Sequence, residues 1–189
     1  MTIVRASALA LLAMLCVETA RADILGEAAG KYTIEPSSSI NFKVGQVGGG
    51  GINGVFGKFS GVFTISDKGV SQSDVVFTLF PESVATKDSR IENFLRSSAV
   101  FDSAKFPKVT FRSTSVKQVN ATTAKIEGLL TARGITKPAS FTASLSNRNG
   151  RQIDFHVLGS ISRAPYGMDV GTPIYSNVVQ FDMKLVGRR

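Results

Sequence analysis

The stretch IDFHVLGSI, residues 153–161, decides the fold. Apolar side chains such as Phe155 and Val157 occupy its odd-numbered positions, and polar ones such as Asp154 and His156 lie between them. A two-residue alternation of this kind is typical of a β-strand that buries one face and exposes the other. The stretch therefore predicts a long strand with one apolar face, and it places the side chain of His156 on the polar face.

The same alternation recurs along most of the chain, in segments separated by turn-forming residues. The further predicted strands are Tyr32–Ile34, Ile40–Val44, Lys58–Ile65, Val75–Leu79, Val109–Ser115, Ile126–Thr131, Phe141–Leu145 and Phe181–Leu185. Asp67–Gly69 and Asn147–Gly150 have the composition of hairpin turns. About eight or nine strands without intervening helices predict an all-β, antiparallel fold, which is either a sandwich or an up-and-down barrel.

One segment, Asp88–Ser98, has a helical period instead. Its apolar positions are Ile91, Phe94 and Leu95. Ser89 followed by Glu92 has the spacing of a capping box, which would start a short amphipathic helix. Such a helix either lies across the mouth of a barrel or packs against its outside.

Four consecutive glycines, Gly48–Gly51, stand between two of the predicted strands. They are either a flexible lid or an ordinary mobile turn of a β-protein. The segment Gly51–Lys58 does not have the glycine spacing of a phosphate-binding loop, and Lys58 leads into a strand rather than a helix.

The first 22 residues have the three parts of a secretory signal peptide. Arg5 precedes an uncharged run, Ala6–Val17, and Ala20-Arg21-Ala22 fits a signal-peptidase site. The run has about 12 residues, whereas a membrane-spanning helix needs about 20. We therefore expect residues 1–22 to be cleaved, leaving a single domain, residues 23–189, in the periplasm.

Cleavage would also remove the only cysteine, Cys16, so that the mature chain could form neither a disulfide nor a thiolate metal site. The formal charge of +8 would fall to about +7 with the loss of Arg5, Arg21 and Glu18. This charge suits a solvated basic surface, an anionic membrane surface or an acidic ligand. Nucleic acid is not an expected partner, because the basic residues are scattered and the protein is exported.

Catalytic motifs are missing from the sequence. His156 is the only histidine, and metal sites normally need several converging ligands. No Gly-x-Ser-x-Gly segment supplies a nucleophile that could use it. Glu82, Asp88 and Glu92 are close in sequence, but nothing places two of them in one cleft. The sequence therefore predicts no catalytic residue, no metal site and no cofactor.

Several motifs, in order along the chain, resemble those of one family of exported proteins. They are Tyr32-Thr33-Ile34-Glu35-Pro36, the segment Gly54–Gly61, Arg90 with Phe94-Leu95-Arg96-Ser97 and Phe101-Asp102, Lys105–Val116, the segment Gly128–Pro138, and Ser162-Arg163 with Tyr166-Gly167-Met168. Gly128–Pro138 is the most specific of these. Together they resemble the YceI-like family of lipid-binding proteins across the whole mature chain. One departure is Ser37-Ser38-Ser39, where many members have a histidine.

This resemblance implies an extended, lipocalin-like antiparallel barrel of about eight strands with one short helix. It also implies a long apolar lumen and a long-chain isoprenoid lipid as the ligand. The residues predicted to line the lumen are Phe42, Phe59, Phe63, Phe77, Phe94, Leu95, Phe111, Phe141, Phe155 and Phe181. The alternative is that these side chains form a filled core. Arg96, Arg133 and Arg163 are candidates for contacts with an anionic head group, or are surface charges and ion-pair partners.

The expected function is therefore that of a periplasmic protein that sequesters or carries a polyprenyl or quinone-like lipid, and not that of an enzyme. Contact with a membrane surface and association with a second copy of the chain are further possible interactions. Two other functions stay open at this point. One is an envelope stress-related protein that interacts through the outer surface of the barrel and holds no stable ligand. The other is an isomerase or hydrolase acting on a lumenal lipid with His156 as its base.

Overall fold

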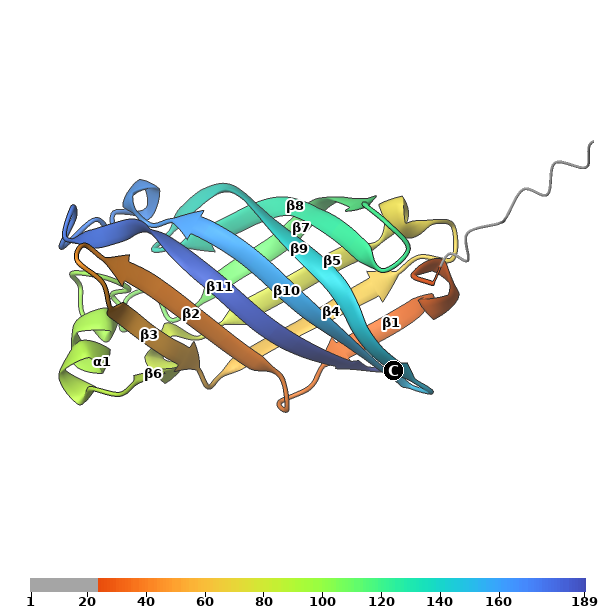
Figure 1. Ribbon diagram of the computed structural model, residues 1–189, viewed down its shortest axis with the longest axis horizontal. Helices are drawn as coiled ribbons and strands as arrows, with labels where there is room; N and C mark the ends of the chain where they lie inside the picture. Colours follow the sequence, from red (N-terminus) through yellow and green to blue (C-terminus); the bar gives the residue numbers. More distant parts are fainter. Residues whose placement is uncertain (1–23) are drawn as a thin grey trace, which may run out of the picture.

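The structure is a computed structural model that describes residues 24–189. The predicted signal peptide, residues 1–22, lies outside the described residues. Antiparallel strands wind around a long axis and form an elongated barrel, with helix α1 (Ser89–Arg96) at one end (Figure 1). Among the described residues, no helix is long and apolar enough to cross a bilayer.

Within residues 24–189, eleven strand segments form one continuous sheet. They are β1 (Gly30–Ile34), β2 (Ser39–Gln46), β3 (Gly51–Phe56), β4 (Phe59–Ile65), β5 (Asp74–Leu79), β6 (Val84–Thr86), β7 (Val109–Gln118), β8 (Thr123–Ala132), β9 (Ile135–Asn149), β10 (Gln152–Ser162) and β11 (Tyr175–Arg188). Every segment predicted as a strand from the sequence coincides with one of them. The predicted Lys58–Ile65 begins one residue early, because Lys58 precedes β4.

Eight of the segments close into a barrel in the order β1-β4-β5-β7-β8-β9-β10-β11. β11 returns to β1 and closes the ring through the pairs Thr33↔Arg188 and Ile34↔Gly187. β2, β3 and β6 continue the same sheet from β11 and lengthen the wall at the α1 end. The predicted all-β, antiparallel barrel is thus confirmed, and the sandwich is excluded.

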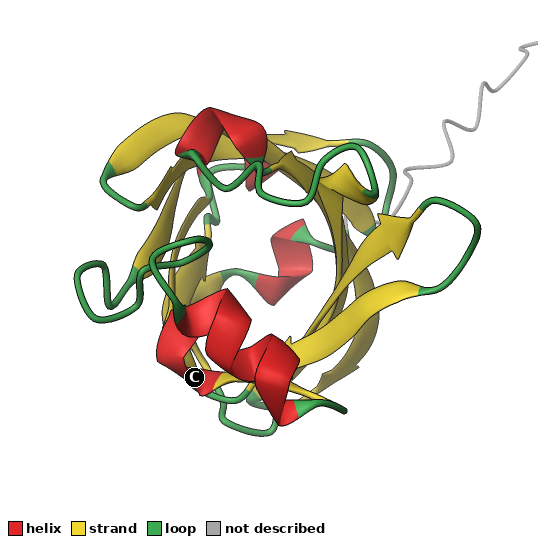
Figure 2. Cartoon of the chain, turned by 90° about the vertical axis from the view of Figure 1, so that its left-hand side faces the viewer, coloured by secondary structure: helices red, strands yellow, loops and turns green. Residues whose placement is uncertain are grey.

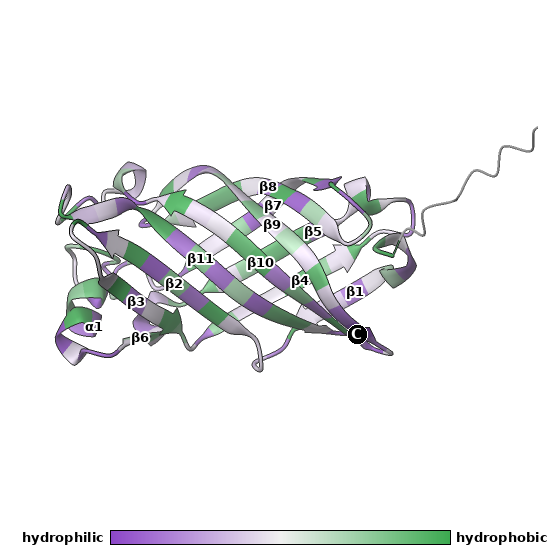
Figure 3. Cartoon of the chain, in the orientation of Figure 1, coloured by the Kyte–Doolittle hydropathy of each residue, from purple (hydrophilic) through white to green (hydrophobic). Residues whose placement is uncertain are grey.

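The two faces of each strand have different surroundings. Along β10, Val157 is buried inside the barrel, whereas His156 lies outside, with its Nε2 2.8 Å from Oδ1 of Asp182 on β11. Figure 3 shows the resulting alternation of hydrophobic and hydrophilic residues along β10 and β11. The placement of His156 on the polar face is confirmed, because alternation along a strand fixes which side chains share a face.

The N-cap of helix α1 lies one residue before the predicted capping box. The carboxylate of Asp88 is the N-cap and accepts a hydrogen bond from the backbone N–H of Arg90 at 2.9 Å. Glu92 instead accepts from the N–H of Thr86, at the end of β6, at 2.8 Å. The predicted Ser89–Glu92 capping box is therefore wrong. Asp and Ser are similarly good N-caps, and the strand leading into the helix places Asp88 at that position.

Of the two predicted hairpin turns, one is confirmed and the other is part of a longer connection. Asn147–Gly150 forms the turn between β9 and β10, as expected. Asp67–Gly69 is only part of a longer β4–β5 connection, which adds a turn of 3-10 helix at Val70–Gln72. The glycine run forms the β2–β3 turn, in which Gly48, Gly49 and Gly50 have φ values of 84°, 103° and 80°. Residues with a Cβ rarely adopt such angles, so the turn requires glycine.

Candidate functional site

A cavity of about 630 Å³ occupies the inside of the barrel. This volume lies within the range of about 300–1,000 Å³ that is usual for sites binding small molecules. Its wall is mostly aliphatic and aromatic, and its few polar side chains include Thr64, Asp88, Arg90 and Arg163. The filled core that the sequence left open as an alternative is therefore not what the barrel contains.

Nine of the ten predicted lumen residues line this cavity: Phe42, Phe63, Phe77, Phe94, Leu95, Phe111, Phe141, Phe155 and Phe181. Phe59 does not line it. Its ring stacks on that of Phe77 with 6.2 Å between the ring centroids, so that Phe77 takes the position next to the lumen. Contact between these residues and a ligand stays a prediction.

Three of the phenylalanine rings lie close against a glycine that is their partner across a strand pair. These ring–glycine pairs are Phe42↔Gly54, Phe77↔Gly61 and Phe141↔Gly159. A β-carbon added at Gly54 would lie 2.7 Å from the ring of Phe42, and one at Gly61 would lie 3.0 Å from Phe77. A β-carbon at Gly159 would overlap the ring of Phe141 more severely.

Each ring thus occupies the space that a side chain would take if the glycine were any other residue. Glycine allows this close approach of a neighbouring group. A ring held against the wall does not project into the middle of the barrel. The ring–glycine pairs therefore explain how a barrel so rich in phenylalanine keeps a cavity. Sequence analysis found the phenylalanines but missed these glycines, because their role depends on which residues face each other across strands.

The two ends of the cavity differ. At the end away from α1, Leu25 and Val70 are 2% and 6% exposed and form a cluster with Val116 and Ala124 that closes the barrel. At the other end, the lining includes residues of α1 and its N-cap and residues of the loop before β11. They are Asp88, Arg90, Phe94, Val170 and Gly171. We call these five residues the mouth. Figure 2 looks into this end of the barrel, with α1 in front and loops around the opening.

Helix α1 therefore lies across the mouth, which decides between the two positions expected from the sequence. Ile91, Phe94 and Leu95 turn toward the cavity, and Leu95 is 6% exposed. The Arg90 guanidinium, which donates hydrogen bonds to the carboxylate of Asp88, holds the pKa of that carboxyl below its usual value of 3.8. The cap of α1 is thus ionised at neutral pH, which favours the helix.

Arg163 is the charged side chain most enclosed by the wall of the cavity, at 7% exposure. Its guanidinium donates hydrogen bonds to four backbone carbonyls: Ser176 O at 2.9 Å, Val170 O at 2.9 Å, Tyr175 O at 3.2 Å and Met168 O. Burial lowers the pKa of this guanidinium, although the normal value is so high that it stays charged. Arg163 thus fixes the loop before β11 and places a positive charge beside the lumen.

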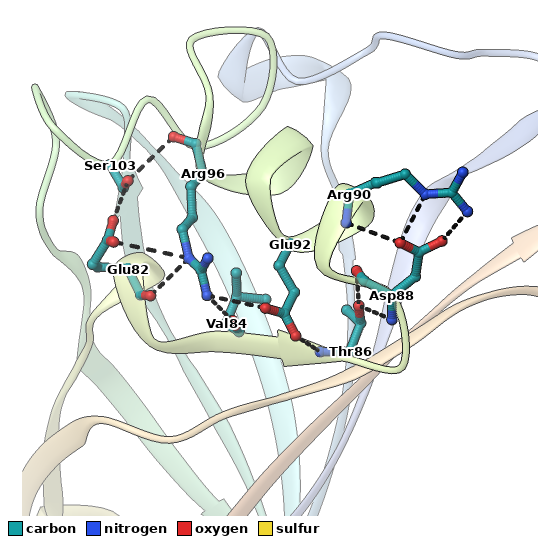
Figure 4. Close-up of polar contacts among 8 residues, drawn as sticks. All are labelled: Glu82, Val84, Thr86, Asp88, Arg90, Glu92, Arg96 and Ser103. Carbon is teal, nitrogen blue, oxygen red and sulfur yellow. Dashed lines mark hydrogen bonds and ion pairs between the residues drawn. The ribbon is translucent and has the colours of Figure 1, made fainter.

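The other two arginines predicted for a head group also bind backbone carbonyls. Arg96 donates to Glu82 O at 2.9 Å and to Val84 O at 2.7 Å, which ties α1 to the strand below it (Figure 4). Arg133 donates to Val100 O at 2.9 Å and to Gly167 O at 2.8 Å. Neither lines the cavity. All three arginines hold segments around the mouth, and of the three only Arg163 borders the lumen.

Catalytic chemistry has no cluster of groups to support it in the part of the chain that the structure describes. His156 is on the outer face, opposite the cavity-lining Val157 along the strand. Within residues 24–189, no three histidine, cysteine or acidic side chains come together as metal ligands would. The arrangement suits the retention of an apolar molecule, since burial of apolar surface alone supplies about 25 cal/mol per Å².

Comparison with known proteins agrees with this geometry. The model of the YceI-like domain matches residues 32–187. Protein YceI of Salmonella arizonae and that of Salmonella enteritidis are each 30% identical to the chain over 167 residues, covering 84% of this chain and 87% of the relative.

Solved structures share the fold at lower identity. BcnA of Burkholderia cenocepacia superimposes with a TM-score of 0.74 at 21% identity, covering 81% of this chain and 98% of that one. A polyisoprenoid binding domain from Saccharophagus degradans gives a TM-score of 0.65 at 16% identity, covering 85% and 98%. With the domain match extending over most of its length, the chain belongs to the YceI-like family.

Proposed function

We propose that this protein is a periplasmic binding protein that sequesters or carries a long-chain isoprenoid lipid in its barrel. The observation that carries the proposal is the cavity of about 630 Å³, closed at one end by Leu25 and Val70 and reaching the surface at the mouth. A lumen with one opening and an apolar wall suits a long tail with a more polar head. The polyisoprenoid binding domain that shares this fold supports the choice of lipid.

The tail would run along the ring–glycine pairs toward Val70, and the head would remain at the mouth. Burial of each methylene contributes about 0.8 kcal/mol, so several isoprene units bind through apolar contact alone. Arg163 and Arg90 both line the cavity near the mouth, and they favour a head group that carries negative charge or strong hydrogen-bond acceptors. The predicted signal peptide supports the periplasmic location.

Binding without catalysis is the function that this geometry favours. The only histidine of the chain forms its hydrogen bond with Asp182 on the outer face of the barrel. Its side chain therefore does not face the lumen, where a base would have to meet the lipid. Replacing His156 by alanine should therefore leave the bound lipid and its chemical form unchanged.

Mass spectrometry of an organic extract tests the proposal. The protein is purified from the envelope of its host, extracted and compared with two variants, Phe77→Arg and Val76→Arg. Phe77 lines the cavity, whereas the adjacent Val76 is 37% exposed on the outer face. We expect a stoichiometric prenyl lipid in the wild type and in Val76→Arg, and none in Phe77→Arg. Circular dichroism confirms that both variants fold. A wild-type protein that contains no lipid and ignores added polyprenyl compounds would exclude the function.

The alternative of an interaction through the outer surface has one observation in its favour. Val55 and Leu158 are 42% and 47% exposed and border the same shallow depression on the outer wall. If this function holds, the wild type contains no stable ligand and Leu158→Asp abolishes binding to a partner protein, whereas Phe77→Arg lowers the stability of the protein. Sedimentation equilibrium of the same preparations tests whether two copies of the chain associate.

A further inference from the structure

Exposed apolar side chains gather at the mouth end of the barrel. Val47, in the β2–β3 turn, is 74% exposed, and Ile174, just before β11, is 58% exposed. The two lie side by side, because the backbone N–H of Val47 donates a hydrogen bond to Ile174 O at 2.9 Å. Two large aliphatic side chains at adjacent positions form a surface that water solvates poorly.

This surface continues into the lumen. Among the apolar residues that line the cavity, Phe94 and Val170 are the exposed ones, at 43% and 40%. Both belong to the mouth, and the carbonyl of Val170 is held by the guanidinium of Arg163. We call Val47, Ile174, Phe94 and Val170 the mouth rim; they are exposed apolar residues at this end, and two of them, Phe94 and Val170, also belong to the cavity wall beside Asp88 and Arg90.

The glycines that follow Val47 in the β2–β3 turn have open space beside them. β-carbons added at Gly48, Gly49 or Gly50 would meet no atom within 4 Å. Since these three positions are open and Val47 and Ile174 are themselves exposed, a flat surface can approach the two side chains.

Charge at the same end favours an anionic surface. The side chain of Arg90 is 89% exposed while it pairs with Asp88 at 2.7 Å, and the neighbouring Lys87 is also exposed. The whole sequence carries a formal charge of +8, of which about +7 would remain after removal of the predicted signal peptide. Apolar side chains that enter the boundary of a bilayer, together with basic residues that meet its head groups, are the usual combination for reversible membrane attachment.

We infer that the mouth rim docks on an anionic phospholipid bilayer, inserting Val47 and Ile174 and placing the opening against the membrane. This inference rests on the proposed function and adds the surface through which the ligand is exchanged. In this position, a prenyl tail passes from the bilayer to the lumen along Phe94 and Val170 without crossing water. A protein partner is the other class that could cover such a patch, and the test below separates the two.

Vesicle co-sedimentation tests the docking surface. The full protein is mixed with vesicles of phosphatidylcholine and phosphatidylglycerol, and with phosphatidylcholine vesicles, at low and high salt. The variant Val47→Asp/Ile174→Asp is compared with Val119→Asp. Val119 is a matched control, because it is 63% exposed in the β7–β8 turn at the opposite end of the barrel.

We expect the wild type and Val119→Asp to bind the anionic vesicles, with weaker binding at high salt, and the double variant to bind at least tenfold more weakly. The transfer of a fluorescent prenyl probe from vesicles should slow by a similar factor. Wild-type protein that fails to sediment, or equal losses in the double variant and in Val119→Asp, would overturn the inference. If the patch binds a protein partner instead of a membrane, the wild-type protein should fail to sediment with the vesicles.

The lipid content of the double variant separates this inference from the proposed function. Val47 and Ile174 do not line the cavity, so the variant should still contain lipid in an organic extract. Unchanged vesicle binding by a variant that retains its lipid would refute the docking surface alone. Wild-type protein without any lipid that still binds anionic vesicles through Val47 and Ile174 would refute the proposed function alone.

Discussion

Adding a single methyl group at Gly159 should reduce the space available to a ligand. Gly159 on β10 faces Phe141 on β9, and a β-carbon there would overlap the ring. The ring must then turn away from the wall and into the lumen. Since a benzene ring fits an engineered cavity of about 150 Å³, we expect the loss of on the order of 100 Å³. This is a substantial part of a cavity of about 630 Å³.

The loss of binding free energy has an upper limit that follows from the lost space. The lost space would hold about four or five carbons of a tail at ~0.8 kcal/mol each, which sets an upper limit of about 4 kcal/mol. Because the tail can shift toward the mouth, we expect binding to weaken by about 1–2 kcal/mol, or roughly 5- to 30-fold. Overpacking costs about 1–3 kcal/mol of stability. The lower entropy of the unfolded chain offsets about 0.4–1 kcal/mol of it.

Titration of delipidated protein with a fluorescent prenyl probe measures the affinity, and urea denaturation measures the stability. Gly45→Ala is the control, since a β-carbon at Gly45 meets no atom within 4 Å. The double variant Gly159→Ala/Phe141→Leu should recover most of the affinity, because the smaller side chain removes the overlap. If Gly159→Ala binds the probe as tightly as the wild type does, the glycine does not hold the ring out of the lumen and the reasoning fails.

Three further predictions concern the residues around the mouth. Arg163→Met leaves four carbonyls without their donor and should lower the free energy of unfolding by about 3–5 kcal/mol in urea denaturation, with a smaller loss for Arg163→Lys. Because the folded-state pKa of Asp88 is lowered, its stabilising effect is present above its usual pKa of 3.8 and is lost as the pH falls through the folded value. Hydrogen exchange in α1 should accelerate over that range in the wild type but not in Asp88→Asn, which keeps a neutral cap, and equal pH dependence would refute this role. Arg96→Met removes the bonds from α1 to Glu82 O and Val84 O, so stopped-flow measurements should show faster release of a bound probe, whereas an unchanged rate would mean that α1 does not control the opening.

The strand faces were predictable because alternation is a local property of the sequence. Phe155 and Val157 are two residues apart and share the inner face, as expected, and His156 lies outside. The same two-residue alternation predicted the other strand residues that line the cavity. Phe59 is the exception, because a shared face does not reveal that the ring of Phe77 lies between it and the lumen.

Features that depend on distant parts of the chain were not predictable. The pairing of Gly159 with Phe141 requires the register of β9 and β10, which alternation alone does not give. Arg163 and Arg133 were recognised as charges, but the carbonyls that they bind, such as Val170 O and Val100 O, lie in segments whose positions depend on the folded chain. The family motif around Arg133 has a local explanation in the structure, since Arg133 and Gly134 have φ values of 50° and 75° and form the two-residue turn between β8 and β9.

A crystal structure of the protein purified from its host without delipidation tests the central claim most directly. We predict one continuous, elongated feature of electron density in the lumen, passing Phe141 and Phe77 and ending near Val70, with its wider end at Arg163. A lumen that contains only ordered water or inward-turned phenylalanine rings, with lipid on the outer wall, would contradict the account.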